Sequence, residues 1–148
     1  MVNAVIKGIS IELGMEFGKN YKVHTESIEQ GLKEPCFFIT CVNPAQRHMY
    51  GFGHVKRYSK EMQFCIQYFP SNKKALNDEC NDVTERLFQC LEYITPYKAD
   101  MPVHGTNMRA DVVDDVLNFF VNYDFYTYHI TEAEETMGSM SRINRVRR

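Results

Sequence analysis

Two segments of the chain, residues 62–69 and 117–126, alternate large apolar side chains with Gln, Asn or Asp. Successive side chains of a β-strand point to opposite faces, so this alternation predicts two strands that each bury one face. One face of the second strand carries Leu117, Phe119, Val121, Tyr123 and Phe125. The other carries Asn118, Phe120, Asn122, Asp124, Tyr126 and Tyr128. Three aromatic rings are a heavy load for a face in water, and either a covering helix or a partner surface would account for them.

Two other segments have apolar residues at steps of three and four, the spacing of a helix with one buried side. The first stripe consists of Val2, Ile6, Ile9, Leu13 and Phe17. The second consists of Leu76, Cys80, Val83, Leu87, Leu91 and Ile94. Gly18 is suited to end the first helix, and Thr95–Pro96 to end the second.

Shorter signals complete the predicted order. Residues 21–25, 36–42 and 108–113 have strand character, and Asp114–Asp115 predicts a turn into the long strand that begins at Leu117. Residues 43–60 hold one Pro, two Gly and six Lys, Arg or His, which predicts a long loop. The order is α-β-β-β-α-β-β. We therefore expect an α+β fold: a mixed, mainly antiparallel sheet of about four to five strands with two helices packed on one face.

The chain has 148 residues, a hydrophobic fraction of 44% and a formal net charge of -2. This length predicts a single α/β domain over residues 1–131, and the composition changes there to a charged C-terminal arm, 132–148, expected to be mobile in the isolated protein. The weak net charge argues against a general nucleic-acid-binding protein. Five Cys without close spacing, and no long apolar run, predict a reduced, cytoplasmic protein with no membrane contact.

No segment has the spacing of a catalytic or metal site. Gly51-Phe52-Gly53 lacks the third glycine of a phosphate loop, so a turn is favoured. The five His residues show no paired ligand spacing, and the carboxylates of the second helix are expected on its solvated face. Those carboxylates are Asp78, Glu79, Asp82 and Glu85. We expect no catalytic residue, no metal and no cofactor.

Four blocks of the sequence resemble the phage tail terminator family of Gram-positive phages and prophages. They are EQGLKEPCFFI at 29–39, FCIQYFP at 64–70, NDVTERL at 81–87 and VDDVLNFFVNY at 113–123. The likeness covers residues 1–130. It implies a small α/β subunit that assembles with itself into a ring, expected to be a hexamer, on the head-proximal end of the tail tube. There it would stop tube polymerisation and provide the surface for head–tail joining.

The resemblance also implies the partners and the place of action. These are the tail tube protein, head–tail connector proteins and, in a contractile tail, the sheath; DNA is only passing cargo. The protein would occupy the host cytoplasm during assembly and then the virion tail. The contact residues expected from the 43–60 segment and the C-terminal arm are Arg47, His48, Arg57, Tyr58, Arg142, Arg145, Arg147 and Arg148.

Two other functions stay open from the sequence. A head–tail connector or completion protein at a neighbouring ring would share the small size and ring assembly. A small metal-dependent hydrolase would use His48, His54 and the carboxylates of the second helix. Location in the particle separates the first from a terminator, and bound metal would support the second.

Overall fold

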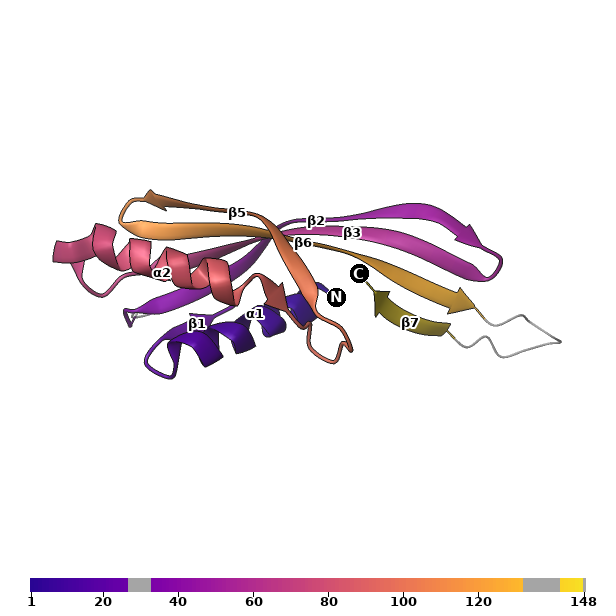
Figure 1. Cartoon of the computed structure of the whole chain (residues 1–148), viewed down its shortest axis with the longest axis horizontal. Coiled ribbons are helices and arrows are strands. Elements are labelled where there is room, and N and C mark those ends of the chain that lie inside the picture. The colour runs from indigo at the N-terminus through magenta and orange to yellow at the C-terminus, as the bar shows by residue number, and fades with distance from the viewer. Residues whose placement is uncertain (27–32, 132–141, 148) are drawn as a thin grey trace.

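The computed structural model describes residues 1–26, 33–131 and 142–147, with the backbone alone from Thr131 onward. Two helices, α1 (Val2–Phe17) and α2 (Leu76–Cys90), lie on the same face of a seven-stranded sheet (Figure 1). A short 3₁₀ turn, η1 (Lys73–Ala75), precedes α2, and the Asn72 side chain caps it. The α+β class and the placement of both helices on one face are confirmed.

The sheet order is β1-β2-β3-β6-β5-β4, with β7 paired to β6 outside this path. Among the described strands, only the β1–β2 pair is parallel. The strands are β1 (Lys22–His24), β2 (Cys36–Phe52), β3 (Val55–Phe69), β4 (Tyr93–Ile94), β5 (Val103–Val113), β6 (Val116–Thr131) and β7 (Arg142–Arg147). The sheet therefore has more strands than the expected four to five, because the sequence pattern did not indicate β4 and β7.

The core lies between the helices and the inward face of the sheet. From α1 it takes Val5, Ile9, Leu13 and Phe17, and from β6 it takes the predicted set of Leu117, Phe119, Val121, Tyr123 and Phe125. Burying these apolar side chains supplies most of the stability of the fold. The Tyr123 hydroxyl, fully buried, donates to the Leu91 carbonyl oxygen at 2.6 Å, so its polar end is satisfied.

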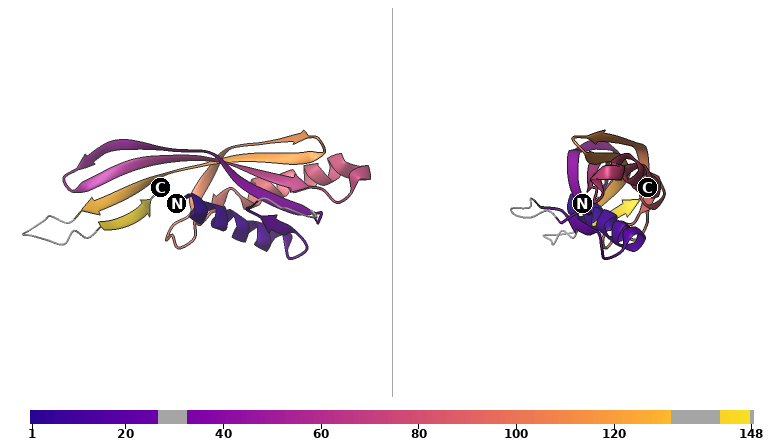
Figure 2. Two further views of the ribbon diagram at one scale, coloured as in Figure 1. Left: turned by 180° about the vertical axis from the view of Figure 1, so that it is seen from behind. Right: turned by 90° about the vertical axis from the view of Figure 1, so that its left-hand side faces the viewer.

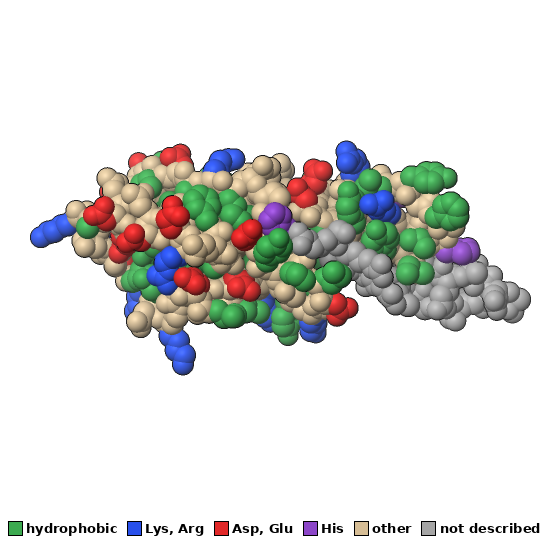
Figure 3. All heavy atoms as spheres, in the orientation of Figure 1, with side chains coloured by type: hydrophobic (Ala, Val, Ile, Leu, Met, Phe, Trp, Pro, Cys, Tyr) green, Lys and Arg blue, Asp and Glu red, His purple; other side chains and the backbone are tan. Residues whose placement is uncertain are grey.

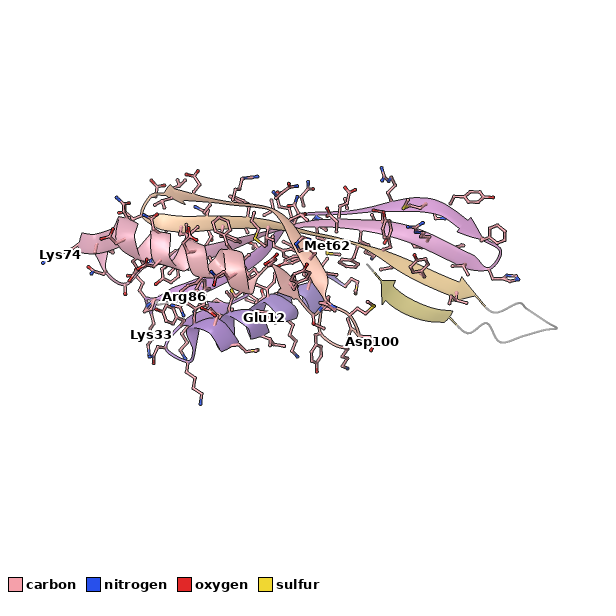
Figure 4. The ribbon with its side chains drawn as sticks, viewed as in Figure 1. Glu12, Lys33, Met62, Lys74, Arg86 and Asp100 are labelled. Atoms are coloured by element: carbon pink, nitrogen blue, oxygen red, sulfur yellow. The ribbon has the colours of Figure 1, made fainter. Side chains whose placement is uncertain are left out.

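The side chain of Arg86 links the two helices at the surface. Arg86 of α2 donates from Nε to the Glu16 carboxylate at 3.0 Å and from Nη2 to the Glu16 carbonyl oxygen at 2.7 Å, and its guanidinium lies 4.1 Å from the centre of the Phe17 ring. Figure 4 shows Arg86 between the two helices. The contact fixes the C-terminal end of α1 against α2.

The second helix is shorter than its apolar stripe. It ends at Cys90, where Leu91 leaves the helical conformation, and not at Thr95–Pro96 as the spacing predicted. Leu91 and Ile94 are nevertheless buried, because β4 pairs with β5 and returns the chain to the same core. Helical spacing alone does not distinguish these two ways of burying a residue.

The segment predicted as a long loop is instead the outer half of a β-hairpin. Residues 43–60, which we name the hairpin arm, belong to β2 and β3 and pair with each other on both sides of a turn at Gly53–His54. Met62 is the first core residue of β3, and on the side of Met62 toward Val55 the sheet extends beyond the helices (Figures 1, 2 and 4). Neither α1 nor α2 covers this half, so polar residues occupy both faces of the arm, and the alternation that marks a strand is lost.

Candidate interaction surface

The strand register brings together the two segments that the sequence assigned to partner binding. Arg57 of β3 lies opposite Tyr128 of β6, which lies opposite Arg145 of β7. Two residues further along each strand, Ser59 is opposite Tyr126, and Tyr126 is opposite Arg147. Positions two apart on a strand share a face, so the backbones of the hairpin arm and β7 form one continuous surface.

The predicted contact residues have different positions on this surface. Arg47 and His48 are exposed, and Arg57 and Tyr58 are half-buried. Arg142, Arg145 and Arg147 lie on β7, where the sequence predicted a mobile arm and the structure has a strand paired to β6. Arg148 lies outside the described residues. Their role in binding stays a prediction.

Arginine side chains cover the aromatic residues on the outward face of β6. The Arg57 guanidinium lies 4.2 Å from the centre of the Tyr126 ring and 5.9 Å from that of Tyr128. Arg109 covers Phe120 in the same way at 4.4 Å. A cation above an aromatic ring is attracted by the negative face of the ring. Arginines from neighbouring strands, and not a second helix layer, therefore partly cover these rings.

The opposite face of the hairpin arm carries a row of rings across three strands. The centres of the His48 and Tyr58 rings are 5.3 Å apart, and those of Tyr58 and His129 are 5.1 Å apart. Both pairs meet edge to face, which is a favourable arrangement for aromatic rings. Tyr58 thus belongs to a packed row that stiffens the arm.

Two further aromatic residues stand at the tip of the arm. Tyr50 and Phe52 are 89% and 85% exposed. Sequence reasoning missed them because they lie within a segment taken for a loop, although aromatic residues beside glycine in a basic segment were a usable signal. Exposed aromatic side chains of this kind are typical anchors of protein–protein contacts.

Charge is distributed unevenly between the hairpin arm and the rest of the chain. Residues 43–60 contain four Lys or Arg and no Asp or Glu, whereas residues 1–42 and 61–131 together contain nine basic and sixteen acidic residues. In Figure 3 acidic side chains gather over the helix-covered half, and the end with the β2–β3 turn shows none in that view. The described molecule is therefore electrically polarised along its length.

A polar hollow of about 360 Å³ lies on the outward face where the hairpin arm begins. Its walls include Glu61 and Asp124, which are directly opposite each other on β3 and β6. Burial, and next the charge of Glu61, raise the pKa of Asp124, while a backbone hydrogen bond at Met62 lowers it. Two like charges facing each other across a ladder destabilise the native sheet.

Asp124→Asn is expected to stabilise the protein at pH 7 by roughly 0.2–0.5 kcal/mol, because solvent screens much of the repulsion that the change removes. The raised pKa means that native Asp124 takes up a proton more readily than the unfolded chain does, so the wild type gains on the variant as the pH falls toward 4. Thermal melts of both proteins at pH 7 and pH 4 measure this. An exposed carboxyl elsewhere, Asp100, serves as the Asn control; a pH-independent difference for Asp124→Asn would contradict the prediction.

The residues of the hydrolase alternative are not brought together. His48 and His54 lie at or near the tip of the hairpin arm, whereas α2 lies at the other end of the sheet (Figure 1). Among the described residues, no three His, Cys, Asp or Glu side chains are grouped as metal ligands. All five thiols are free, and burial raises the pKa of each, which disfavours the reactive thiolate. Gly51-Phe52-Gly53 forms part of the hairpin tip, with Gly53 at a φ of 61°.

No helix in the described part of the chain is long and apolar enough to span a membrane.

The family model described as "Phage tail terminator protein" matches residues 4–137. The chain belongs to the phage tail terminator family. The resemblance seen in the four sequence blocks is thereby confirmed, and the protein is a structural component of a phage tail. The match includes the whole hairpin arm of this terminator and stops before β7. Among curated proteins, none matches the chain.

Proposed function

We propose that this terminator forms a hexameric ring on the head-proximal end of the tail tube. There it stops tube polymerisation and offers the head-side surface to which the connector joins. The hairpin arm carries the proposal: a stiff, helix-free extension of the sheet, with exposed aromatic and basic side chains, reaches beyond the compact body. A repeated contact of this kind around a closed ring holds every subunit in place at once.

The contact residues are assigned to the hairpin arm and the C-terminal segment. Arg47, His48, Arg57 and Tyr58 would serve from β2 and β3. Arg142, Arg145 and Arg147 would serve from β7, which is separated from β3 by β6, and Arg148 follows them in the sequence. The partners would be further copies of the chain, the tube protein, the connector and, in a contractile tail, the sheath. The acidic body would hold passing DNA only weakly, because like charges repel phosphate.

Reconstruction of the assembled tail by electron microscopy tests this proposal. Density for the chain is expected as a six-fold ring at the head-proximal end of the tube, and phage lacking the protein should produce tubes of uncontrolled length. Density at a neighbouring ring on the connector side would instead identify a head–tail completion protein. Absence of the chain from the tail would end both assignments.

A matched pair of variants tests the arm itself. Arg47→Ala with His48→Ala removes two exposed arm side chains, and Lys19→Ala with Lys22→Ala removes two exposed side chains from the body. Only the arm variant is expected to lower the fraction of tubes that carry the protein. Equal occupancy for the two variants would remove the arm from the proposed interface.

A further inference from the structure

Both ends of the sheet present exposed apolar side chains. Those at the end of the hairpin arm have basic neighbours, and those at the β5–β6 turn have acidic neighbours. Near the tip of the hairpin arm, Tyr50 and Phe52 are accompanied by the exposed cation Lys56, and a second exposed cation, Arg47, lies further back on β2 opposite Ser59. At the turn between β5 and β6, Val112 and Val113 are 40% and 49% exposed. Their exposed neighbours are Asp111, Asp114 and Asp115, and we name residues 111–115 the acidic turn.

The acidic turn is built to hold its shape. Val113 pairs with Val116, so only Asp114 and Asp115 connect the strands. Both have positive φ angles, 52° and 63°, the conformation of a tight two-residue hairpin that follows the twist of the sheet. A rigid turn gives up little conformational freedom when it is bound.

The arm tip and the acidic turn of one molecule do not meet each other. The unbroken β3–β6 ladder separates them, from Val55 opposite Ile130 to Tyr68 opposite Leu117. At about 3.4 Å per residue, a ladder of this length keeps the two ends roughly 40 Å apart. The opposite charges on the two ends can therefore meet each other only between molecules.

We infer that the hairpin-arm tip of one subunit docks onto the acidic turn of the next subunit. Lys56 at the tip, and Arg47 further back on the arm, face the carboxylates of Asp111, Asp114 and Asp115 of the neighbour, while Tyr50 and Phe52 cover its two exposed valines. Such a contact joins two different surfaces, and it produces a closed ring when the rotation between subunits closes. The inference rests on the proposed ring and names the two surfaces that build it.

The acidic turn favours a second copy over DNA as the occupant of the tip. A basic tip alone would suit phosphate, yet a DNA contact at the tip would not involve the rigid, acidic and partly apolar turn. Complementary charges at both ends of one chain instead match a repeating contact between identical subunits.

Two variants reverse or neutralise one end each. The tip variant carries Arg47→Glu and Lys56→Glu at exposed positions. The turn variant carries Asp111→Lys, Asp114→Asn and Asp115→Gly, because Asn-Gly suits the positive φ angles of this turn and keeps the hairpin folded. The control variant, Lys19→Glu with Lys22→Glu, makes the same charge change as the tip variant on the body. Circular dichroism and thermal melts establish that each variant is folded.

Sedimentation velocity of the full-length chain, over a range of NaCl concentrations, measures assembly. The wild type is expected to assemble less as salt rises, and each end variant alone should lose at least about tenfold in association constant, since like charges then face each other. An equimolar mixture of the two variants is expected to assemble again. Around the ring, the altered tip of one variant would meet the altered turn of the other, and the native tip of the second would meet the native turn of the first. The control variant should behave like the wild type.

Several outcomes would overturn the inference. Either end variant alone could assemble like the wild type, the mixture could fail to recover, or the wild type could stay monomeric at every salt concentration. A tip variant that loses binding to duplex DNA but keeps its assembly would also overturn it, and would make the tip a DNA-binding surface. Tube-length control is scored separately: tubes capped normally by both end variants would refute the inference and leave the proposed function standing, whereas a wild type that never reaches the tube end refutes that function.

Discussion

Replacing Phe119 by alanine is expected to lower the free energy of unfolding by about 3–5 kcal/mol, a large fraction of the about 5–15 kcal/mol that stabilises an ordinary domain. The ring is fully buried near the start of β6 and lies edge to face with Phe88 of α2 at 5.4 Å between ring centres. Its removal leaves a cavity between the sheet and α2 that rigid neighbours cannot fill. Urea denaturation followed by circular dichroism measures the loss.

The adjacent residue supplies the control. Phe120→Ala makes the same chemical change on the outward face, where the ring is half-buried beneath the Arg109 guanidinium. The expected loss is about 1 kcal/mol, from the cation–ring contact and a small buried area. Similar losses for both variants would mean that the outward face of β6 is as enclosed as the core.

Gly8→Ala is the second change with a large expected effect, a loss of about 1–3 kcal/mol from overpacking. A Cβ at this position of α1 would lie 2.6 Å from the Thr95 carbonyl oxygen and 3.3 Å from the Pro96 Cα. Backbone atoms cannot rotate away as a side chain can. The helix would have to move from the segment that holds it, where the Tyr97 N–H donates to the Ala4 carbonyl oxygen at 2.9 Å and Lys7 lies over the Tyr97 ring.

The same helix contains a matched glycine without this constraint. A Cβ at Gly14 would meet nothing within 4 Å, and the position is exposed. Gly14→Ala is therefore expected to stabilise the protein by about 0.5–1 kcal/mol, the ordinary gain of alanine over glycine in a helix. Thermal melts of the two variants should shift in opposite directions; a shift of Gly8→Ala upward would contradict the close approach of α1 to residues 95–96.

The parts of the fold that were predictable from sequence are those where one face meets the core and the other meets water. The alternation in β6 separated the buried Phe119 from the half-buried Phe120, and the stripe in α1 ended at Gly18 as expected. Asp114–Asp115 was predicted as a turn and forms one. For the strand and the helix, the order of apolar and polar residues follows directly from the difference in solvation between the two faces. For the turn, the residue types themselves suit the conformation.

The hairpin arm was missed because that difference is absent there. Arg47, His48 and Lys56 are exposed on strands whose two faces both lack a helix, so their sequence resembles a loop. The short β4 was missed because Ile94 continues a helical spacing after the helix has ended. β7 pairs with β6, the strand that precedes it in the sequence, but no local pattern in Arg142–Arg147 indicates this pairing.

The candidate surface was predictable in composition but not in arrangement. Basic residues marked both the 43–60 segment and the C-terminal segment as contact elements. That the two share one sheet surface depends on the register of three strands, and the cover over Tyr126 depends on the position of Arg57 opposite Tyr128. Tyr50 and Phe52 became candidates only once the turn at Gly53–His54 placed them at an exposed end.

The pairing of β3 with β6 has no register shift between Val55, at the end of the arm, and Tyr68, in the core. No hinge therefore exists along these two strands to absorb a pull on the tip. Tension applied there would act parallel to the strands and would load many interstrand hydrogen bonds in shear together, the direction in which a sheet resists rupture best. A subunit joined to its neighbours through the arm would therefore transmit mechanical stress along β3 and β6 directly to its hydrophobic core.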